Sequence, residues 1–531
     1  MRLFSFDRSS AFVRWSRDLA LSKGWSRAFS PALGNSRPSR GFSRWGKVIV
    51  TTALVALLAG CTVGPKYQRA QSPTAPAWKT QPPWESATPK DNISKGAWWA
   101  IYHEDQLNQL EQQLLQANQS LAAAASRLQE ARAFARVQTG AYFPQVAVDP
   151  NASRSRFSAN REYLGGTPAT APVTQNIFNI PFSLSYEVDL FGRVRKNLEA
   201  ANANLQASAA DLQNVQLVLS AELAGDYFNL RELDSETGVL REAVDSQAKA
   251  LQLIENRHNG GVASGLEVAQ QAALLDSTRT QLALIQQQRA QYEHAIATLT
   301  GHPASTFTLS VAPLRATVPP IPLGVPSDVL ERRPDIATAE RRMAYENAEV
   351  GVATTAFYPH ITLSAAGGVQ STSLGSLISA PSGVWSFGAD LLQPIFEGGR
   401  NRANLALAKA NYDESVANYR ESVLEAFQQV EDSLAGLNAL AQAQKTQQAA
   451  VEDSQRALTL ANNRYIGGIA TYLDVVTAQT ALLDNERLGA QLLGQQMVTS
   501  VQLVKALGGG WDASQLQNEQ VHPQARQVVQ Q

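Results

Sequence analysis

The sequence predicts a mixed α and β fold, in which long coiled-coil helices alternate with amphipathic strands inside an internal two-fold repeat. Three observations lead to this prediction. Residues 193–301 match residues 400–508 at a constant offset of 207, without a gap. Apolar residues recur at every seventh position in both segments, as they do in coiled coils. Ahead of each segment, apolar and polar residues alternate with the period of a strand that has one exposed face.

The chain begins with a basic presequence, residues 1–60, which carries ten Lys or Arg and two acids. An apolar run of 12 residues, 48–59, follows the basic flank. This pattern is typical of a secretory signal peptide, because a membrane-spanning helix needs about 20 residues. The Leu-Ala-Gly-Cys sequence at 58–61 resembles a bacterial lipobox, which predicts covalent lipid on Cys61. A plain signal peptide that ends at a cysteine is the alternative.

The repeat sets the predicted organisation of the rest of the chain. A lipid-anchored linker covers 61–104, and the first repeat covers 105–301, with strands within 142–191 and long helices over 193–301. A connector at 302–326 leads to the second repeat, 327–511, with strands within 357–396 and long helices over 400–508. A polar tail follows at 512–531. Glycine pairs recur in fixed register, at Gly260-Gly261 and Gly467-Gly468, which chance similarity between Ala-rich helices does not explain.

The long helices follow from periodicity and from the lack of helix breakers. No proline lies between Pro181 and Pro303, or between Pro394 and Pro523, so nothing in these segments forces a helix to end. A helix over 193–256 would be about 95 Å long, which suits a tube or a stalk better than a compact core. The heptad positions are Leu198, Leu205, Leu212 and Leu219 in the first repeat and Val416, Val423, Val430 and Leu437 in the second.

The strands ahead of these helices alternate cleanly. Segments of about ten alternating residues are typical of membrane barrels, although a soluble antiparallel sheet with one wet face has the same period. Four strands cannot close a barrel, because known barrels have about eight or more. If these strands span a membrane, several chains must share one barrel. The predicted outward residues are Phe182, Leu184, Tyr186, Val188, Leu190, Trp385, Phe387, Ala389 and Leu391, and the inward ones are Ser183, Ser185, Glu187, Asp189, Ser386, Gly388 and Asp390.

Composition argues against an enzyme. Residues 61–531 carry 35 basic and 44 acidic residues, so the mature chain is a poor candidate for binding nucleic acid. The single cysteine excludes an intramolecular disulfide, and no two of the six histidines fall within four residues of each other, so no metal pair on one helix exists. The sequence also lacks a phosphate-binding glycine loop and a nucleophile elbow. We therefore expect no catalytic residues, no metal and no cofactor apart from the lipid on Cys61.

The chain resembles the TolC-like outer-membrane factors, in particular the lipoprotein (NodT-type) branch that serves resistance-nodulation-division efflux systems. The most specific segment is Leu-Glu-Arg-Arg-Pro-Asp-Ile at 330–336, close to the family's signature with Arg333, Pro334 and Asp335. A proline suits the first turn of a helix and an acid suits its positive end, so this motif reads as structural. The resemblance implies a trimer with one 12-stranded barrel through the outer membrane, four strands from each chain, continued by a periplasmic helical tunnel.

The resemblance also implies a gate where the two helix turns form the periplasmic tip. The candidate residues of the second repeat are Arg464, Tyr465 and Asp474, beside Gly467 and Gly468. Their counterparts in the first repeat are Arg257 and Glu267, beside Gly260 and Gly261. In a trimer, Glu267 and Asp474 would present six carboxylates to one pore, and such rings select cations. Alternatively, both acids are simply solvated residues in the first turn of a helix.

The predicted function is a passive export channel for drugs and amphiphiles in the bacterial outer membrane. The resemblance implies a homotrimer whose partners are a periplasmic adaptor (membrane fusion protein) and an inner-membrane resistance-nodulation-division transporter. Two alternatives stay open. One is a periplasmic coiled-coil lipoprotein that acts as a spacer or adaptor, and the other is an export channel for proteins in type I secretion.

Overall fold

The computed structural model describes residues 62–72, 77–79, 97–159, 171–321, 329 and 331–523. All of them belong to one compact unit, 59–531. The presequence and the predicted lipid site Cys61 lie outside the described residues. Within the described ranges, no helix is both long enough and apolar enough to cross a membrane.

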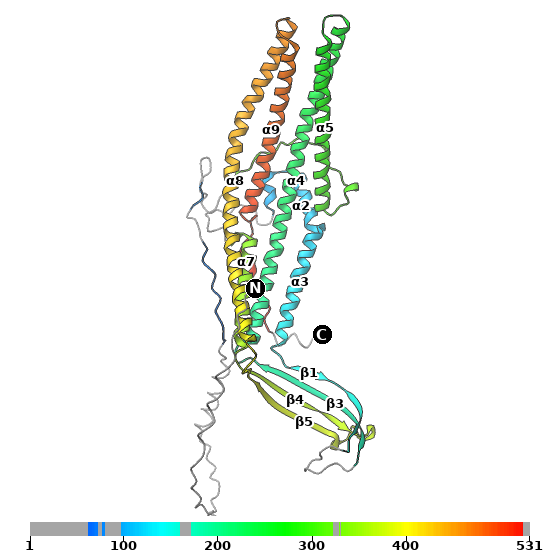
Figure 1. Ribbon diagram of the computed structural model, residues 1–531, viewed down its shortest axis with the longest axis vertical. Helices are drawn as coiled ribbons and strands as arrows, with labels where there is room; N and C mark the ends of the chain where they lie inside the picture. The colour runs from blue at the N-terminus through cyan, green and yellow to red at the C-terminus, as the bar shows by residue number, and fades with distance from the viewer. Residues whose placement is uncertain are drawn as a thin grey trace, which may run out of the picture. The chain divides into compact units, whose positions relative to one another are not determined.

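Four long helices dominate the structure and form two hairpins. Helices α4 (Arg193–Asn259) and α8 (Arg400–Ile466) each have 67 residues. Helices α5 (Gly265–Leu299) and α9 (Tyr472–Ala506) each have 35 residues. The turns of the α4–α5 hairpin and the α8–α9 hairpin lie at the same end of the helices (Figure 1). A helix of 67 residues is about 100 Å long.

Shorter helices complete the helical part. They are α2 (Asp105–Ala117), α3 (Gln119–Gly140) and α7 (Pro334–Thr355). Helix α4 packs along α3, α5, α7 and α9, while α8 packs along α7 and α9. The predicted heptad residues Leu198, Leu205, Val423 and Val430 are buried in these contacts. Short 3-10 helices are η1 (Trp98–Tyr102), η2 (Ala304–Thr306), η3 (Leu374–Ser376), η4 (Ala380–Ser382) and η5 (Ala513–Asn518).

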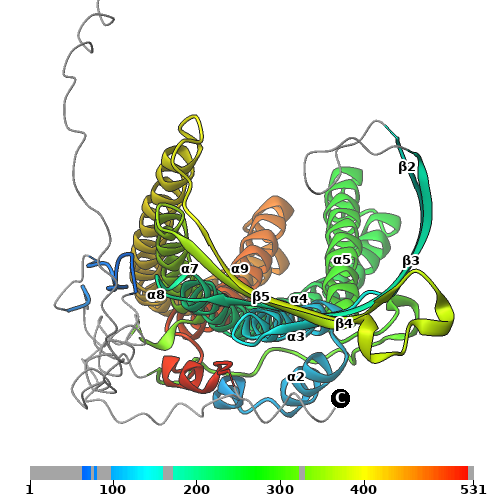
Figure 2. The same cartoon turned by 90° about the horizontal axis from the view of Figure 1, so that it is seen from below.

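The strands form one antiparallel sheet, which Figure 2 shows side by side and curved. They are β1 (Gln145–Val148), β2 (Asn151–Phe157), β3 (Val173–Val188), β4 (His360–Ser371) and β5 (Gly383–Leu392). The order is β1-β3-β4-β5, and β2 also pairs with β3. Because β1 and β2 pair with β3 in one continuous register, they act as a single strand that is interrupted at Asp149 and Pro150.

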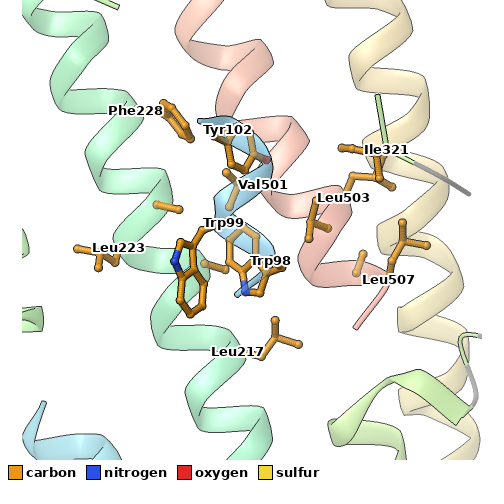
Figure 3. Packing of buried hydrophobic residues seen from close by; sticks show 14 of the residues in the cluster. Trp98, Trp99, Tyr102, Leu217, Leu223, Phe228, Ile321, Val501, Leu503 and Leu507 are labelled. Atoms are coloured by element: carbon orange, nitrogen blue, oxygen red, sulfur yellow. The ribbon is translucent and has the colours of Figure 1, made fainter. Parts of the chain in front are cut away.

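The main core lies where η1 and α2 pack against α4 and α9. Trp98, Trp99 and Tyr102 are buried there, and Figure 3 shows them between α4 and α9. The Trp98 and Trp99 ring centroids are 5.9 Å apart at an interplanar angle of 76°, the edge-to-face arrangement that aromatic pairs favour. The Tyr102 hydroxyl lies 2.9 Å from the Ser500 hydroxyl of α9. Short N-terminal elements thus fasten the two hairpins together.

Both ends of the described chain pack against the rest of the fold. Near the N-terminus, the Val63 N–H donates to the Phe191 carbonyl at 3.1 Å, and Arg69 Nε donates to the Tyr419 hydroxyl at 3.1 Å. Near the C-terminus, Trp511 and Leu516 are buried against α3 and α4. Arg132 of α3 forms an ion pair with Glu519, at 2.6 Å. The described part of the predicted polar tail is therefore packed onto the helices.

Candidate functional site

The two helix turns have the same backbone geometry. Gly260 and Gly467 have φ values of −81° and −75°, which any residue adopts. Only the second glycine of each pair, Gly261 and Gly468, has a positive φ, of 75° and 73°. Glycine reaches this region without the steric cost that a Cβ atom brings. The sequence predicted tight turns at both pairs, and the structure assigns the positive φ to one position in each.

The two predicted gate acids occupy equivalent positions, in the first turn of α5 and of α9. The Glu267 N–H donates to the Ser264 hydroxyl at 3.4 Å. Asp474 and Thr471 form a capping box, in which the Thr471 N–H donates to Asp474 Oδ2 at 3.2 Å. Acids are favoured there because the first turn carries the positive end of the helix dipole. The helix dipole therefore favours an acid at both positions, and the Asp474 carboxylate also caps its own helix.

A polar link joins the two hairpins near these turns. The Tyr465 hydroxyl at the end of α8 donates to Glu267 Oε2 on α5, at 2.9 Å. The guanidinium carbon of Arg257 lies 5.0 Å from the centroid of the Tyr465 ring, within range of a cation–π contact. Burial and the Glu267 carboxylate raise the pKa of Tyr465, which Arg257 lowers in part. The phenol therefore stays protonated and can donate a hydrogen bond to the Glu267 carboxylate.

A second link lies beneath the first and is buried. The Tyr472 hydroxyl of α9 donates to Gln271 Oε1 of α5 at 2.7 Å. Gln271 Nε2 in turn donates to the Gln247 carbonyl of α4 at 3.0 Å. The Tyr472 ring lies 5.0 Å from the Tyr465 ring. Tyr472 belongs to the predicted tip segment, but its bond to Gln271 was not predicted, because the first repeat has Gly265 in place of Tyr472 and no pattern marks a glutamine as buried.

The structure groups three of the five predicted gate residues. Glu267, Tyr465 and Arg257 meet through the contacts above, whereas Asp474 and Arg464 are exposed. Among the residues that the structure describes, Asp474 bonds within its own helix cap, and no ion pair includes Arg464. Both side chains are thus available to groups outside this chain.

The sheet presents a second functional surface, an apolar face. Directly paired residues on neighbouring strands point to the same face. The register places Val146, Leu184, Ala365 and Phe387 side by side on β1, β3, β4 and β5. The opposite face carries Ser185, Ser364 and Gly388 on β3, β4 and β5. Leu184 and Phe387 therefore lie on the same face of the sheet, as predicted. Trp385 and Phe387 are exposed at 78% and 80% and stack on each other.

The signature motif does more than begin a helix. Arg333 donates from Nε and Nη2 to the two Asp335 carboxylate oxygens, at 3.0 and 2.6 Å. Its Nη1 donates to the Ala506 carbonyl, at 3.1 Å, and to Gln429 Oε1, at 2.9 Å. Asp335 also accepts the Ile336 N–H, and Pro334 is the first residue of α7. The motif joins the start of α7 to α8 and to the end of α9.

In the described ranges of the chain, no group of three or more His, Cys, Asp or Glu side chains is arranged to hold a metal ion.

Comparison with known families gives a match over most of the chain. The family described as "Outer membrane efflux protein" matches residues 110–302 and 325–509. These two segments coincide with the two parts of the fold that carry the long hairpins, α4–α5 and α8–α9.

Individual proteins are similar over nearly their whole length. The pyoverdine export outer membrane protein OpmQ of Pseudomonas aeruginosa is 34% identical over 417 residues, covering 78% of this chain and 88% of that protein. The toluene efflux pump outer membrane protein TtgF of Pseudomonas putida is 32% identical over 473 residues, covering 87% and 97%. The solved structure of the outer-membrane channel OprN superposes with a TM-score of 0.77 at 30% identity, covering 85% of this chain and 100% of that one.

Proposed function

The chain belongs to the outer membrane efflux protein family, and from this premise we propose that it is the exit duct of a tripartite pump, with a gate at its helix tips. It is an outer-membrane channel for efflux, of the TolC fold. The observation that carries the gate proposal is the Tyr465–Glu267 hydrogen bond between the two hairpins. This bond supports a closed tip, because the hairpins cannot separate there without breaking it.

The membrane part is proposed to be a trimer with twelve strands, four from each chain. One face of the sheet is apolar where β1, β3, β4 and β5 pair. Among the described strands, the β1–β2 strand and β5 form the two edges, and an open edge invites pairing with another chain. Edge pairing between copies supports a shared barrel, and the number three comes from family resemblance.

The gate is proposed to be a ring of six carboxylates, Glu267 and Asp474 from each of three chains. Tyr465 holds Glu267 in place through its hydrogen bond, with Arg257 over the Tyr465 ring, and the exposed Arg464 is proposed to face a neighbouring copy. A carboxylate ring lowers the energy of cations in the passage and raises that of anions. Opening would move the hairpins apart, and a partner that binds the open tip better would select that state.

The partners are proposed to be a periplasmic adaptor and an inner-membrane resistance-nodulation-division transporter. The names of the relatives mention pyoverdine and toluene, and we propose small molecules of this kind, drugs and amphiphiles, as the cargo. Transport would be passive in this chain, which is proposed to be neither an enzyme nor a binder of any cofactor. Two other functions, a structural spacer and a protein-export channel, remain as alternatives to small-molecule export.

The protein is proposed to be lipid-anchored through Cys61, with Thr62 as the second residue. Incorporation of labelled palmitate measures this, and the label is expected to disappear in Cys61→Ser. The Cys61→Ser protein is expected to stay in the outer membrane, since one lipid chain is a weak anchor beside a spanning barrel. Palmitate labelling that survives the substitution would contradict the assignment.

Planar-bilayer recording of the purified protein tests the channel, and cross-linking tests the assembly. The expected result is a conducting pore from a species that cross-links to three chains and no further. A spacer would conduct no ions at all. Conductance by a protein that cross-links only to two chains would contradict the twelve-stranded barrel.

A further inference from the structure

The contact between the two hairpin tips uses different residues of two equivalent hairpins. The α4–α5 hairpin contributes Glu267 and Arg257, and the α8–α9 hairpin contributes Tyr465. The hairpins are equivalent, because their helices have equal lengths and their turns have nearly equal positive φ values. Each hairpin therefore carries counterparts of the other's contact residues, which this contact leaves unused. A contact of this heterologous kind closes a ring when copies repeat it.

The repeat identifies the unused counterparts. At the offset of 207, the correspondences are Tyr465 with His258, Glu267 with Asp474, and Arg257 with Arg464. His258, Asp474 and Arg464 are all exposed, whereas Tyr465 is half-buried. If the next copy in a ring repeats the tip contact, His258 of one copy lies against Asp474 of the next. Arg464 then takes the place of Arg257, over the imidazole ring.

The lower link of the tip has no such counterpart. Within the chain, Tyr472 donates to Gln271. At the same offset the corresponding residues are Gly265 and Ala478, and neither has a polar side chain. Of the two hydrogen bonds between the hairpins described above, the repeat therefore carries only the upper one over to the contact between copies.

The orientation of His258 decides when it can bind a carboxylate. Its Nδ1 lies 2.9 Å from the Ala263 carbonyl oxygen. Because a carbonyl only accepts, Nδ1 carries the hydrogen, and Nε2 of a neutral imidazole then has a lone pair and no hydrogen. An ionised carboxylate also only accepts. Nε2 can therefore donate to a carboxylate only when the imidazole is protonated.

Asp474 has an oxygen available for this bond. Its Oδ2 accepts the Thr471 N–H at 3.2 Å, and Oδ1 has no hydrogen-bond partner among the residues that the structure describes. The cap fixes the carboxylate at the start of α9, as Ser264 fixes the start of α5 beside Glu267. The acceptor thus stands in the same local setting as the Glu267 carboxylate that binds Tyr465.

We propose that His258 of one copy binds Asp474 of the next copy through Nε2–H, and that this link forms only with the imidazolium. The inference rests on the ring of copies proposed above. Histidine changes its charge between about pH 5 and 8. The contact between copies is therefore tight in mild acid and loosens as the pH rises, whereas the Tyr465–Glu267 bond within each chain persists.

The charged groups around His258 keep its titration in this range. Within the chain they are Arg257 on its own helix, Glu267 on α5 and the phenol of Tyr465 on α8, which bind one another. From the next copy, Asp474 favours the imidazolium and Arg464 opposes it. Two opposing charges of the neighbour thus act on the same ring.

Cysteine cross-linking tests the contact directly. The Cys61→Ser protein has no other cysteine, so introduced pairs can be joined by a short bis-maleimide. His258→Cys with Asp474→Cys is expected to give covalent trimers on a denaturing gel, because each pair joins two copies. Tyr465→Cys with Glu267→Cys is the matched control and is expected to run as single chains, since that pair lies within one chain.

Two failures of this experiment have different meanings. If amine cross-linking gives trimers but the His258→Cys, Asp474→Cys pair gives only single chains, the present inference is overturned and the proposed channel stands. If amine cross-linking gives no trimer either, the proposed assembly fails, and the contact between copies fails with it.

Single-channel recording tests the dependence on pH. Resting conductance of the unmodified protein is expected to rise about two- to fivefold from about pH 5.5 to about pH 8, the factor for loss of an exposed ion pair. His258→Gln, which does not titrate, is expected to remove the rise. His294→Gln, at an exposed histidine of α5, is the control and is expected to keep it. A rise as steep in His258→Gln as in the unmodified protein, or no rise in the unmodified protein, would overturn the proposal.

Discussion

At the level of single residues, backbone conformation separates glycines that look alike in the sequence. Gly260 and Gly261 are adjacent and both recur in the second repeat, yet only Gly261 has a positive φ. The same distinction holds for Gly467 and Gly468. A pair of glycines indicates a turn, but it does not tell which member carries the left-handed conformation, because that depends on where the helix ends.

Alanine substitution distinguishes the two glycines. Gly261→Ala is expected to lower the free energy of unfolding by about 1–2 kcal/mol, since a Cβ atom is strained at positive φ. Gly260→Ala is the matched control, because its φ is ordinary and its Cβ would lie 3.5 Å from the nearest atom, the Asn256 carbonyl oxygen. Chemical denaturation of both variants measures the difference. Equal loss of stability in the two would contradict the assigned turn geometry.

Side chains at the tip were predictable only in part. The sequence indicated Glu267, Tyr465 and Arg257, and the structure brings these three together. The sequence contains no sign of the Tyr472–Gln271 bond, because a hydrogen bond between side chains on separate hairpins produces no periodic pattern. Asp474 and Arg464 lie exposed, and a single chain does not define what they face in an assembly.

At the level of elements, periodicity predicted the helices well and the strands less evenly. The long helices begin at Arg193 and Arg400, where the repeat match begins. Strand β2 lies within the predicted strand region 142–191, but alternation is weak beyond Val148, because Pro150 interrupts the strand and because Asn151, Arg154 and Arg156 make it mostly polar. Its pairing with β3 supplies hydrogen bonds that no composition rule predicts.

The faces of the sheet give an element-scale prediction. Leu184→Arg is expected to impair trimer assembly, at a cost of about 2–4 kcal/mol if the site lies near the middle of the membrane. Ser185→Arg is the control on the same strand, because its side chain lies on the opposite, polar face. Heat-modified gel mobility of outer-membrane fractions reports assembly. Equal tolerance of arginine at both positions would contradict the assigned faces.

The contact between α4 and α9 gives a second element-scale prediction, about pH. Glu232 of α4 lies against Gly494 of α9, and Glu236 beside it forms an ion pair with Arg487. Burial and Glu236 raise the pKa of Glu232 from 4.5 to about 7, with a smaller opposing effect of Arg487. A raised carboxyl pKa means that the folded state holds its proton more tightly than the unfolded state does.

Stability is therefore expected to fall as the pH rises from about 4.5 to about 7, because ionisation of Glu232 costs more in the folded state. Glu232→Gln is expected to flatten the stability profile in this window. Glu255→Gln, an exposed position on the same helix, is the control and is expected to keep the slope. Thermal unfolding across the pH range measures how stability depends on pH in both variants. If stability falls with pH as steeply in Glu232→Gln as in the unmodified protein, the prediction is contradicted.

At the scale of the whole molecule, the fold shows a sheet with one apolar face joined to two helical hairpins of equal length. The sequence predicted this combination, because alternation and heptads are local signals. It could not give the number of copies, which depends on how many sheet edges close a ring. That number rests on family resemblance.

The central claim is that the paired tips hold the channel shut and select its ions. Tyr465→Phe removes only the hydroxyl that donates to Glu267 and is expected to raise the resting conductance. Tyr412→Phe, at a half-buried tyrosine on the same helix, is the control and is expected to conduct as the unmodified protein does. The Glu267→Gln, Asp474→Asn double variant is expected to lose cation preference with little change in conductance, because side-chain size is kept and an amide oxygen still accepts the Tyr465 bond.

Single-channel recording in planar bilayers, with asymmetric salt to give the ion selectivity, tests this claim most directly. We expect a nearly closed, cation-preferring channel in the unmodified protein, a larger resting conductance in Tyr465→Phe, and weaker cation preference in the double acid variant. If Tyr465→Phe conducts as little as the unmodified protein and the double variant keeps its full selectivity, the helix tips are not the gate.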